Sequence, residues 1–182
     1  MAPAGNSHPQ GLTIGRAALQ QLHQSLLRDA PDHAINILQD AGFAAGEGVY
    51  AAFAEWLATQ TGGTAPPDLD AARLNEMLSG FFQASGWGAI SLRPIGSALA
   101  IDSIDWAEAE PGSAEAPMCY FSSGMLADFI GRLSEETVAV MEVECRSRND
   151  GRCRFLSASP EILNGVYEQM AAGKSYEAAL GT

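Results

Sequence analysis

The sequence lacks two features that would place the protein in a membrane or on nucleic acid. No apolar run approaches the roughly 18 residues that a membrane-spanning helix needs. Cations are scarce, because 10 Lys and Arg residues against 22 Asp and Glu residues give a formal net charge of −12. Nucleic acids and anionic lipid surfaces attract cationic proteins, so we expect neither as a partner.

Cysteine is also scarce, and no secretory leader is recognisable. The start, "MAPAGNSHPQG", has neither the positive charge nor the apolar stretch of a signal peptide. We therefore expect a flexible lead over residues 1–11 and a cytoplasmic protein. The cytoplasm keeps thiols reduced, and three cysteines cannot all pair, so metal binding, catalysis or burial remain as their roles.

Motifs of the common cofactor-dependent activities are missing as well. No G-x-G-x-x-G segment opens a strand–helix unit. The stretch "AGKS" (172–175) fails as a phosphate loop because Glu168 stands where its first glycine should be. No Ser–His–acid or Cys–His set is recognisable either. We favour a non-enzymatic role and leave catalysis open.

The sequence does contain the composition of a globular domain, with 47% hydrophobic and 18% charged residues. We expect one domain over residues 12–182. Its first part, 12–86, shows apolar residues at helical spacing, interrupted at Pro31, with Gly42 as a candidate helix cap. After the loop at 61–68, Asp68 or Asp70 can cap a further helix.

The second part alternates strands with helices. Two strands are separated by a Gly96–Ser97 turn, a helix follows, then a hairpin and a last helix after Pro160. These patterns predict an α+β fold, in which a helical N-terminal lead packs on an antiparallel sheet. The expected α/β part is 87–158, with strands at 89–95, 98–106, 137–147 and 152–157, and helices at 122–133 and 160–180.

The hairpin "MEVECRSRNDGRCRF" (141–155) contains two of the three cysteines. A three-residue loop at 148–150 or 149–151 would place Cys145 and Cys153 on one face, within about 5–8 Å. A two-residue Asn149–Asp150 loop would place them on opposite faces. The sequence does not decide the register, and a metal site requires one of the three-residue loops.

Two thiolates on one face are half of a tetrahedral site, for which zinc is the common occupant. Cys119, just before the preceding helix, is the natural third ligand, while the three histidines lie far away in the N-terminal quarter. Glu142 or Glu144 could be the fourth ligand. A regular strand points both away from Cys145, so either one requires a bulge at 143–144. Small buried hydrophobic residues at a hairpin are the alternative.

The segments "APMCYFSSGMLADFIGRL" and "VAVMEVECRSRNDGRCRFL" resemble the 4-vinyl reductase domain family, over residues 115–158. This family adopts the ligand-binding fold of nitric-oxide-signalling and Golgi-transport proteins, and it occurs in sensor domains of bacterial activators that respond to aromatic effectors. The resemblance implies a zinc ion on Cys119, Glu142, Cys145 and Cys153, spaced C-x22-E-x2-C-x7-C, and it selects Glu142 over Glu144. A zinc ion with four protein ligands is structural.

Four arginines bracket this site and supply much of the positive charge of an acidic chain. Their charge would favour thiolates at the cysteines, and a solvated strand face is the alternative. They are Arg146, Arg148, Arg152 and Arg154.

The resemblance also implies an apolar ligand between the helical lead and the sheet. Large aromatic residues from both parts are the candidate wall, although each is equally explained as ordinary core, and we favour Trp87 and Trp106. The candidates are Phe53, Trp56, Phe81, Phe82, Trp87, Trp106, Tyr120 and Phe121.

Three functions are compatible with these patterns. The first is a zinc-stabilised domain that senses or carries a small hydrophobic or aromatic molecule, paired as a homodimer. The second is a tetrapyrrole 4-vinyl reductase or its accessory protein, which would need a hydride source that the sequence does not reveal. The third is a protein-interaction scaffold without a ligand.

Overall fold

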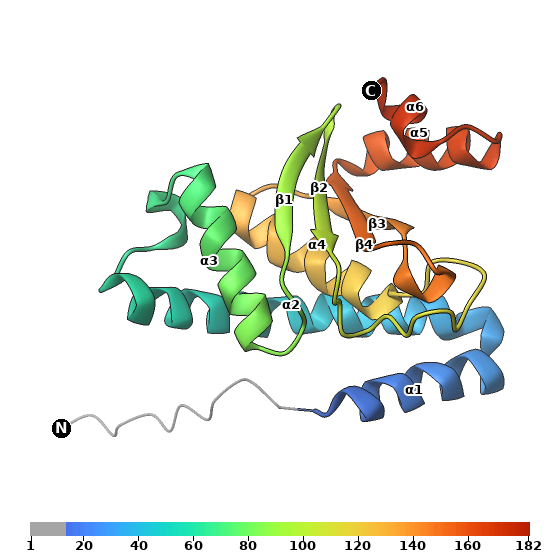
Figure 1. Ribbon diagram of the computed structural model, residues 1–182, viewed down its shortest axis with the longest axis horizontal. Coiled ribbons are helices and arrows are strands. Elements are labelled where there is room, and N and C mark those ends of the chain that lie inside the picture. Colours follow the sequence, from blue (N-terminus) through green and yellow to red (C-terminus); the bar gives the residue numbers. More distant parts are fainter. Residues whose placement is uncertain (1–13) are drawn as a thin grey trace.

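A computed structural model describes residues 14–182 (Figure 1). The expected flexible lead, residues 1–11, lies outside the described residues. The predicted α+β class is confirmed, because helices flank one four-stranded antiparallel sheet of order β1-β2-β4-β3. The strands are β1 (Ser91–Ile95), β2 (Ala98–Ser103), β3 (Ala139–Glu144) and β4 (Cys153–Ala158).

One face of the sheet is covered by the longer helices. A buried core of aromatic and aliphatic side chains lies between them and the strands. Figure 1 shows α1 running antiparallel beside one half of α2. Among residues 14–182, no helix combines the length and hydropathy that crossing a membrane requires. The helices on this side are α1 (Arg16–Asp29), α2 (Pro31–Thr61), α3 (Ala71–Ala84) and α4 (Tyr120–Ser134).

The predicted break at Gly42 is wrong, because α2 is one continuous helix. Gly42 instead lets α2 approach α4 closely. A Cβ atom at Gly42 would lie 1.9 Å from the carbonyl oxygen of Phe121, and one at Gly124 would lie 2.0 Å from the carbonyl oxygen of Gln39. Absence of a side chain at these positions therefore determines how α2 and α4 cross.

The opposite face of the sheet has its own, smaller core beneath α5 (Pro160–Ala171) and α6 (Tyr176–Leu180). These two helices replace the single helix expected over 160–180, since Gly173 adopts a left-handed φ of 89° between them. Alternation along β4 serves both sides: Phe155 joins the larger core and Leu156 the smaller one.

Local signals placed several boundaries correctly. Asp70, one of two candidate caps, accepts a hydrogen bond from the backbone N–H of Arg73 at 2.8 Å and begins α3. The short 3₁₀ helix η1 (Pro66–Asp68) precedes it. The Gly96–Ser97 turn joins β1 to β2 as predicted. Between β2 and α4 the chain forms no regular element, although Trp106 and Glu108 within this stretch are buried.

Candidate metal centre and ligand cavity

Four predicted ligand residues lie together at one end of the β3–β4 hairpin. Cys119 is the residue that precedes α4, Glu142 lies in β3, Cys145 follows β3 and Cys153 begins β4. One ligand atom from each of them lies within 4.8 Å of the other three. The three cysteines are buried in the larger core.

The bulge that the metal hypothesis required is present in β3. The register shifts between Glu142 and Glu144, so that Glu142 pairs with Phe155 while Glu144 pairs with Arg154. The Glu142 carboxylate accepts the backbone N–H of Cys119 at 2.9 Å. Glu144 meets arginines instead, as described below, and the two glutamates of the hairpin therefore serve different sites.

The expected three-residue loop is wrong. The residues between the strands are 145–152, and they contain a 3₁₀ turn, η2 (Arg146–Arg148), before Asn149 adopts a left-handed φ of 68°. Asp150 organises this wider loop, because its Oδ2 accepts the N–H of Cys145 at 2.7 Å and binds Arg148. Since Glu144 still pairs with Arg154, the next residues outward, Cys145 and Cys153, meet at the end of the ladder.

The donor set fits a tetrahedral zinc ion. The sulfur atoms of Cys119 and Cys145 are 3.8 Å apart. Zn–S bonds of about 2.3 Å in a tetrahedron place two sulfur atoms about 3.8 Å apart. Among the residues that the structure describes, Oε1 of Glu142 is buried without a hydrogen-bond partner, while Oε2 is engaged with Cys119. A buried oxygen without a partner, beside three sulfur atoms, is the environment that a cation would satisfy.

Without a cation the cluster resists carrying several negative charges. Burial raises the pKa of the Cys119 thiol. Burial and the neighbouring Cys145 sulfur raise the pKa of Glu142 to about 8. Hydrogen bonds from Cys119 and Cys153 lower the pKa of Cys145, which therefore holds the negative charge. A divalent ion would compensate the charge of the remaining donors.

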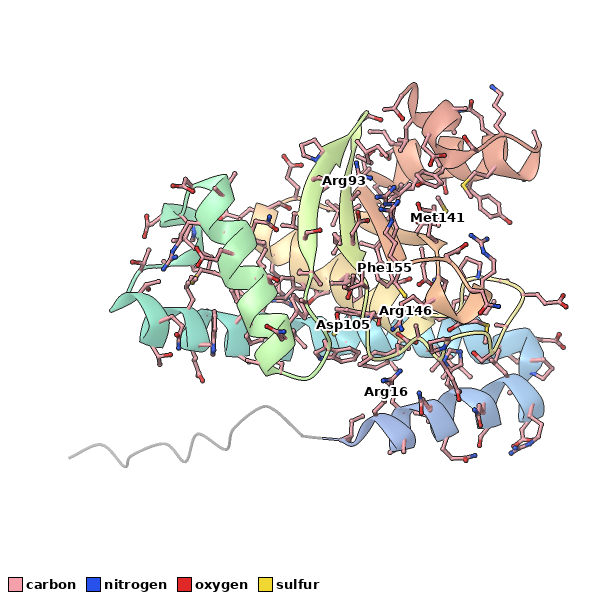
Figure 2. The ribbon with its side chains drawn as sticks, in the orientation of Figure 1. Arg16, Arg93, Asp105, Met141, Arg146 and Phe155 are labelled. Carbon is pink, nitrogen blue, oxygen red and sulfur yellow. The ribbon has the colours of Figure 1, made fainter. Side chains whose placement is uncertain are left out.

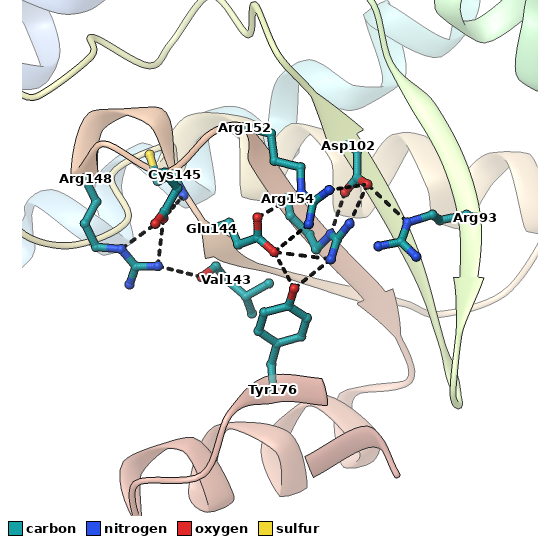
Figure 3. A network of polar contacts seen from close by, with 10 residues as sticks. Arg93, Asp102, Val143, Glu144, Cys145, Arg148, Arg152, Arg154 and Tyr176 are labelled. Carbon is teal, nitrogen blue, oxygen red and sulfur yellow. Dashed lines mark hydrogen bonds and ion pairs between the residues drawn. The ribbon is translucent and has the colours of Figure 1, made fainter. Parts of the chain in front are cut away.

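The hairpin arginines bind carboxylates on the other face of the sheet rather than the sulfur atoms (Figure 3). Arg154, whose side chain is 2% exposed, binds Asp102 through two hydrogen bonds of 2.6 Å. Arg152 binds Glu144 at 2.8 Å, and the hydroxyl of Tyr176 donates to the same carboxylate. This network attaches α6 to the sheet, so Arg152 and Arg154 follow the structural alternative.

A buried carboxylate that sequence reasoning missed lies beside the metal-centre residues. Glu108 accepts the backbone N–H groups of Phe121 at 3.1 Å and Ser122 at 2.8 Å, at the start of α4. Trp106 donates to the Ser122 hydroxyl at 2.7 Å, and His23 of α1 lies 3.7 Å from Glu108. Burial raises the pKa of Glu108 to about 7. Its stretch, "AEAEPGSAEAP", has the composition of an exposed acidic loop and gave no signal of burial.

The eight candidate aromatic residues divide into two groups. Phe53, Phe82 and Trp106 are completely buried in the core, and Trp56 and Tyr120 are partly buried. Rings of the buried group pack on one another and on neighbours at centroid distances of 5.3–5.8 Å. The remaining three, Phe81, Trp87 and Phe121, line a cavity of about 700 Å³.

The cavity lies between α1, α2, α4 and the end of α3. Trp87 and Phe121 form part of its wall as nearly parallel rings, 7° apart with centroids at 6.0 Å. On α2 the wall consists of small residues, including Ala44, Gly48 and Ala52, one helical turn apart. Small side chains on one wall and flat rings on another leave space for a planar apolar molecule.

Comparison with known proteins confirms the resemblance to the 4-vinyl reductase domain family, since residues 106–157 match the model of that domain. The phenol-responsive sensory domain of the transcription activator PoxR, solved with phenol, is similar with a TM-score of 0.62 and 19% identity. That similarity covers 83% of this chain and 77% of the PoxR chain. A vinyl-4-reductase family protein from Methanocaldococcus jannaschii has a TM-score of 0.50 and 16% identity, over 81% of this chain and 83% of that chain. A comparison with curated proteins found no match. These similarities show the fold.

Proposed function

We propose that this chain is a zinc-stabilised domain that binds a small hydrophobic or aromatic molecule, as a sensor or carrier. The observation that carries the proposal is the cavity of about 700 Å³ with its parallel Trp87 and Phe121 rings. The similar fold of the PoxR sensory domain, which was solved with phenol, supports an aromatic ligand. A ligand site of this size is typical of pockets for drug-sized molecules.

The zinc ion of this proposal would be held by Cys119, Glu142, Cys145 and Cys153. Four protein ligands leave no open position, so the ion would supply stability and no chemistry on a substrate. Phe121 lies two residues after Cys119 in the first turn of α4. A metal that holds Cys119 to the hairpin would therefore also position the Phe121 ring in the cavity wall.

Elemental analysis of protein purified without added metal tests the centre. We expect about one zinc per chain, loss of zinc in Cys145→Ser, and weakened retention in Glu142→Gln. Glu144→Gln is the matched control, because Glu144 lies in the same strand and binds Arg152 and Arg154 instead. A wild-type protein without metal, or equal retention by both glutamine variants, would contradict the assigned ligands.

Calorimetric titration with monocyclic aromatic compounds tests the cavity. We expect saturable binding of at least one compound from phenol, toluene, benzamide and benzoate to the wild-type protein. Trp87→Leu should weaken that binding tenfold or more, whereas Tyr167→Leu, an exposed aromatic residue on α5, should not. Absence of binding across the series would contradict the proposal.

Pairing of two copies, expected from the resemblance, belongs to the same proposal. Leu22 on α1 and Phe43 on α2 support it, since both are large apolar side chains that are about half exposed. Sedimentation velocity would measure the mass, and a monomer at tens of micromolar would contradict pairing.

A further inference from the structure

We propose that the cavity selects an aromatic carboxylate, and that Arg16 is the residue that recognises the carboxylate group. This inference rests on the proposed function, because it concerns the chemical class of the molecule bound in the same cavity.

Arg16 is held in place at the cavity wall. It is the first residue of α1 and lines the cavity together with Trp87 and Phe121. Its Nη2 atom donates to the carbonyl oxygen of Ala109 at 2.6 Å. Figure 2 shows the side chain extending from α1 toward the body of the protein. The hydrogen bond restricts the guanidinium before any ligand arrives, which reduces the entropy lost on binding.

The positive charge of Arg16 has no carboxylate partner within residues 14–182. In that part of the chain every arginine except Arg16 and Arg146 forms an ion pair with Asp or Glu. The first 13 residues contain neither Asp nor Glu, so they offer no side-chain carboxylate to it. In a chain with 22 acidic residues, this lack of a partner indicates that an external anion completes the site.

The other charged residue of the cavity wall does not oppose this assignment strongly. Glu47 has a side chain that is 68% exposed, and it pairs with Arg132 at 3.5 Å. Solvent and Arg132 therefore screen its charge. Arg16 is the one cation among the cavity residues.

The chemistry of the guanidinium favours a carboxylate over a neutral polar group. Arg16 has five N–H donors and uses one toward Ala109. A carboxylate can accept two parallel N–H bonds, and such charge-assisted bonds are roughly twice as strong as neutral ones. The ring of the same ligand would contact the Trp87 and Phe121 rings.

Benzoate and benzamide test the proposal, because they share shape and differ in charge. Calorimetric titration at pH 8 should show benzoate binding at least tenfold more tightly than benzamide to the wild-type protein. Arg16→Gln should remove this preference and change benzamide affinity less than twofold. Arg28→Gln is the matched control, since Arg28 lies on the same helix and pairs with its neighbour Asp29. Arg16→Lys should keep part of the preference, because it retains the charge and loses the planar fork.

Equal affinities for benzoate and benzamide in the wild-type protein would overturn this inference while leaving the proposed function intact. A preference for benzoate that persists in Arg16→Gln would overturn it in the same way. Absence of binding by benzoate, benzamide, phenol and toluene together would overturn the proposed function and this inference with it. Circular dichroism melts of each variant, matched to wild type, ensure that affinity changes do not reflect unfolding.

Discussion

At the scale of single residues, the buried carboxyl group of Glu108 should give the protein a measurable pH dependence of stability. Its side chain is 2% exposed, and burial raises its pKa from 4.5 to about 7. Because the native pKa lies above the unfolded value, the native state binds the proton more tightly between these two pH values. Stability from this group is fully present below pH 4.5 and is lost as the pH rises through 7.

The shift corresponds to about 3 kcal/mol of unfolding free energy. Urea unfolding of wild type and Glu108→Gln at pH 4.5 and 7 should show the wild type losing about this much relative to the variant. Burial lowers the pKa of the nearby His23, which stays neutral over most of this range. Glu110→Gln, which removes an exposed carboxylate of the same loop, should follow the wild type. Identical pH profiles for wild type and Glu108→Gln would refute the assignment.

Residue-level prediction from the sequence succeeded where neighbours along the chain carry the information. Cys145 and Cys153 are brought together by a local hairpin, and the resemblance supplied Cys119 and Glu142. Glu108 was not predictable, because its burial depends on α1 and α4 closing over an irregular segment that lies far from α1 in the sequence.

At the scale of elements, the close crossing of α2 and α4 predicts opposite effects for two glycine-to-alanine substitutions. In Gly124→Ala the new methyl group would lie 2.0 Å from the Gln39 carbonyl oxygen, so the two helices must separate. We expect a loss of about 3 kcal/mol or more in unfolding free energy, as for other overpacked sites. Gly165→Ala, inside α5 with no atom within 4 Å of the new methyl group, should gain about 0.5–1 kcal/mol.

Urea unfolding of both variants measures this difference, and the slope of each transition shows whether cooperativity is retained. A Gly124→Ala protein as stable as wild type would mean that α2 and α4 do not approach as closely as described. The same crossing explains why the sequence suggested a helix end at Gly42. Glycine at a helix end and glycine at a helix crossing have the same local pattern, and only the partner helix distinguishes them.

The elements themselves were predictable to different degrees for a related reason. The Gly96–Ser97 hairpin and the Asp70 cap follow from local backbone chemistry, and both are confirmed. The cavity is formed by residues from four separate segments of the chain. Three of its aromatic residues were among the candidates, but sequence spacing could not separate them from core residues such as Phe82.

At the scale of the whole molecule, the sheet separates two differently stabilised halves. One half contains the candidate metal ligands within the larger core, beside α4. The other half holds α5 and α6 against the sheet through the smaller core and the ion-pair network of Asp102, Arg154 and Tyr176. Metal removal should therefore act first on one half, because no metal donor lies in α5 or α6.

Hydrogen exchange after treatment with a zinc chelator would measure this asymmetry. The first turn of α4 and residues 145–153 should lose protection, since three thiols and the Glu142 carboxyl would remain buried without the cation. Amides of α5 and α6 should keep their protection under the same conditions. Tyr176→Phe is the converse control: it removes the hydroxyl that joins α6 to Glu144 and Arg154, so exchange should rise in α6 and not around Cys119. Equal loss of protection in both halves on chelation would show that the sheet transmits the change, and that the metal stabilises the molecule as one cooperative unit.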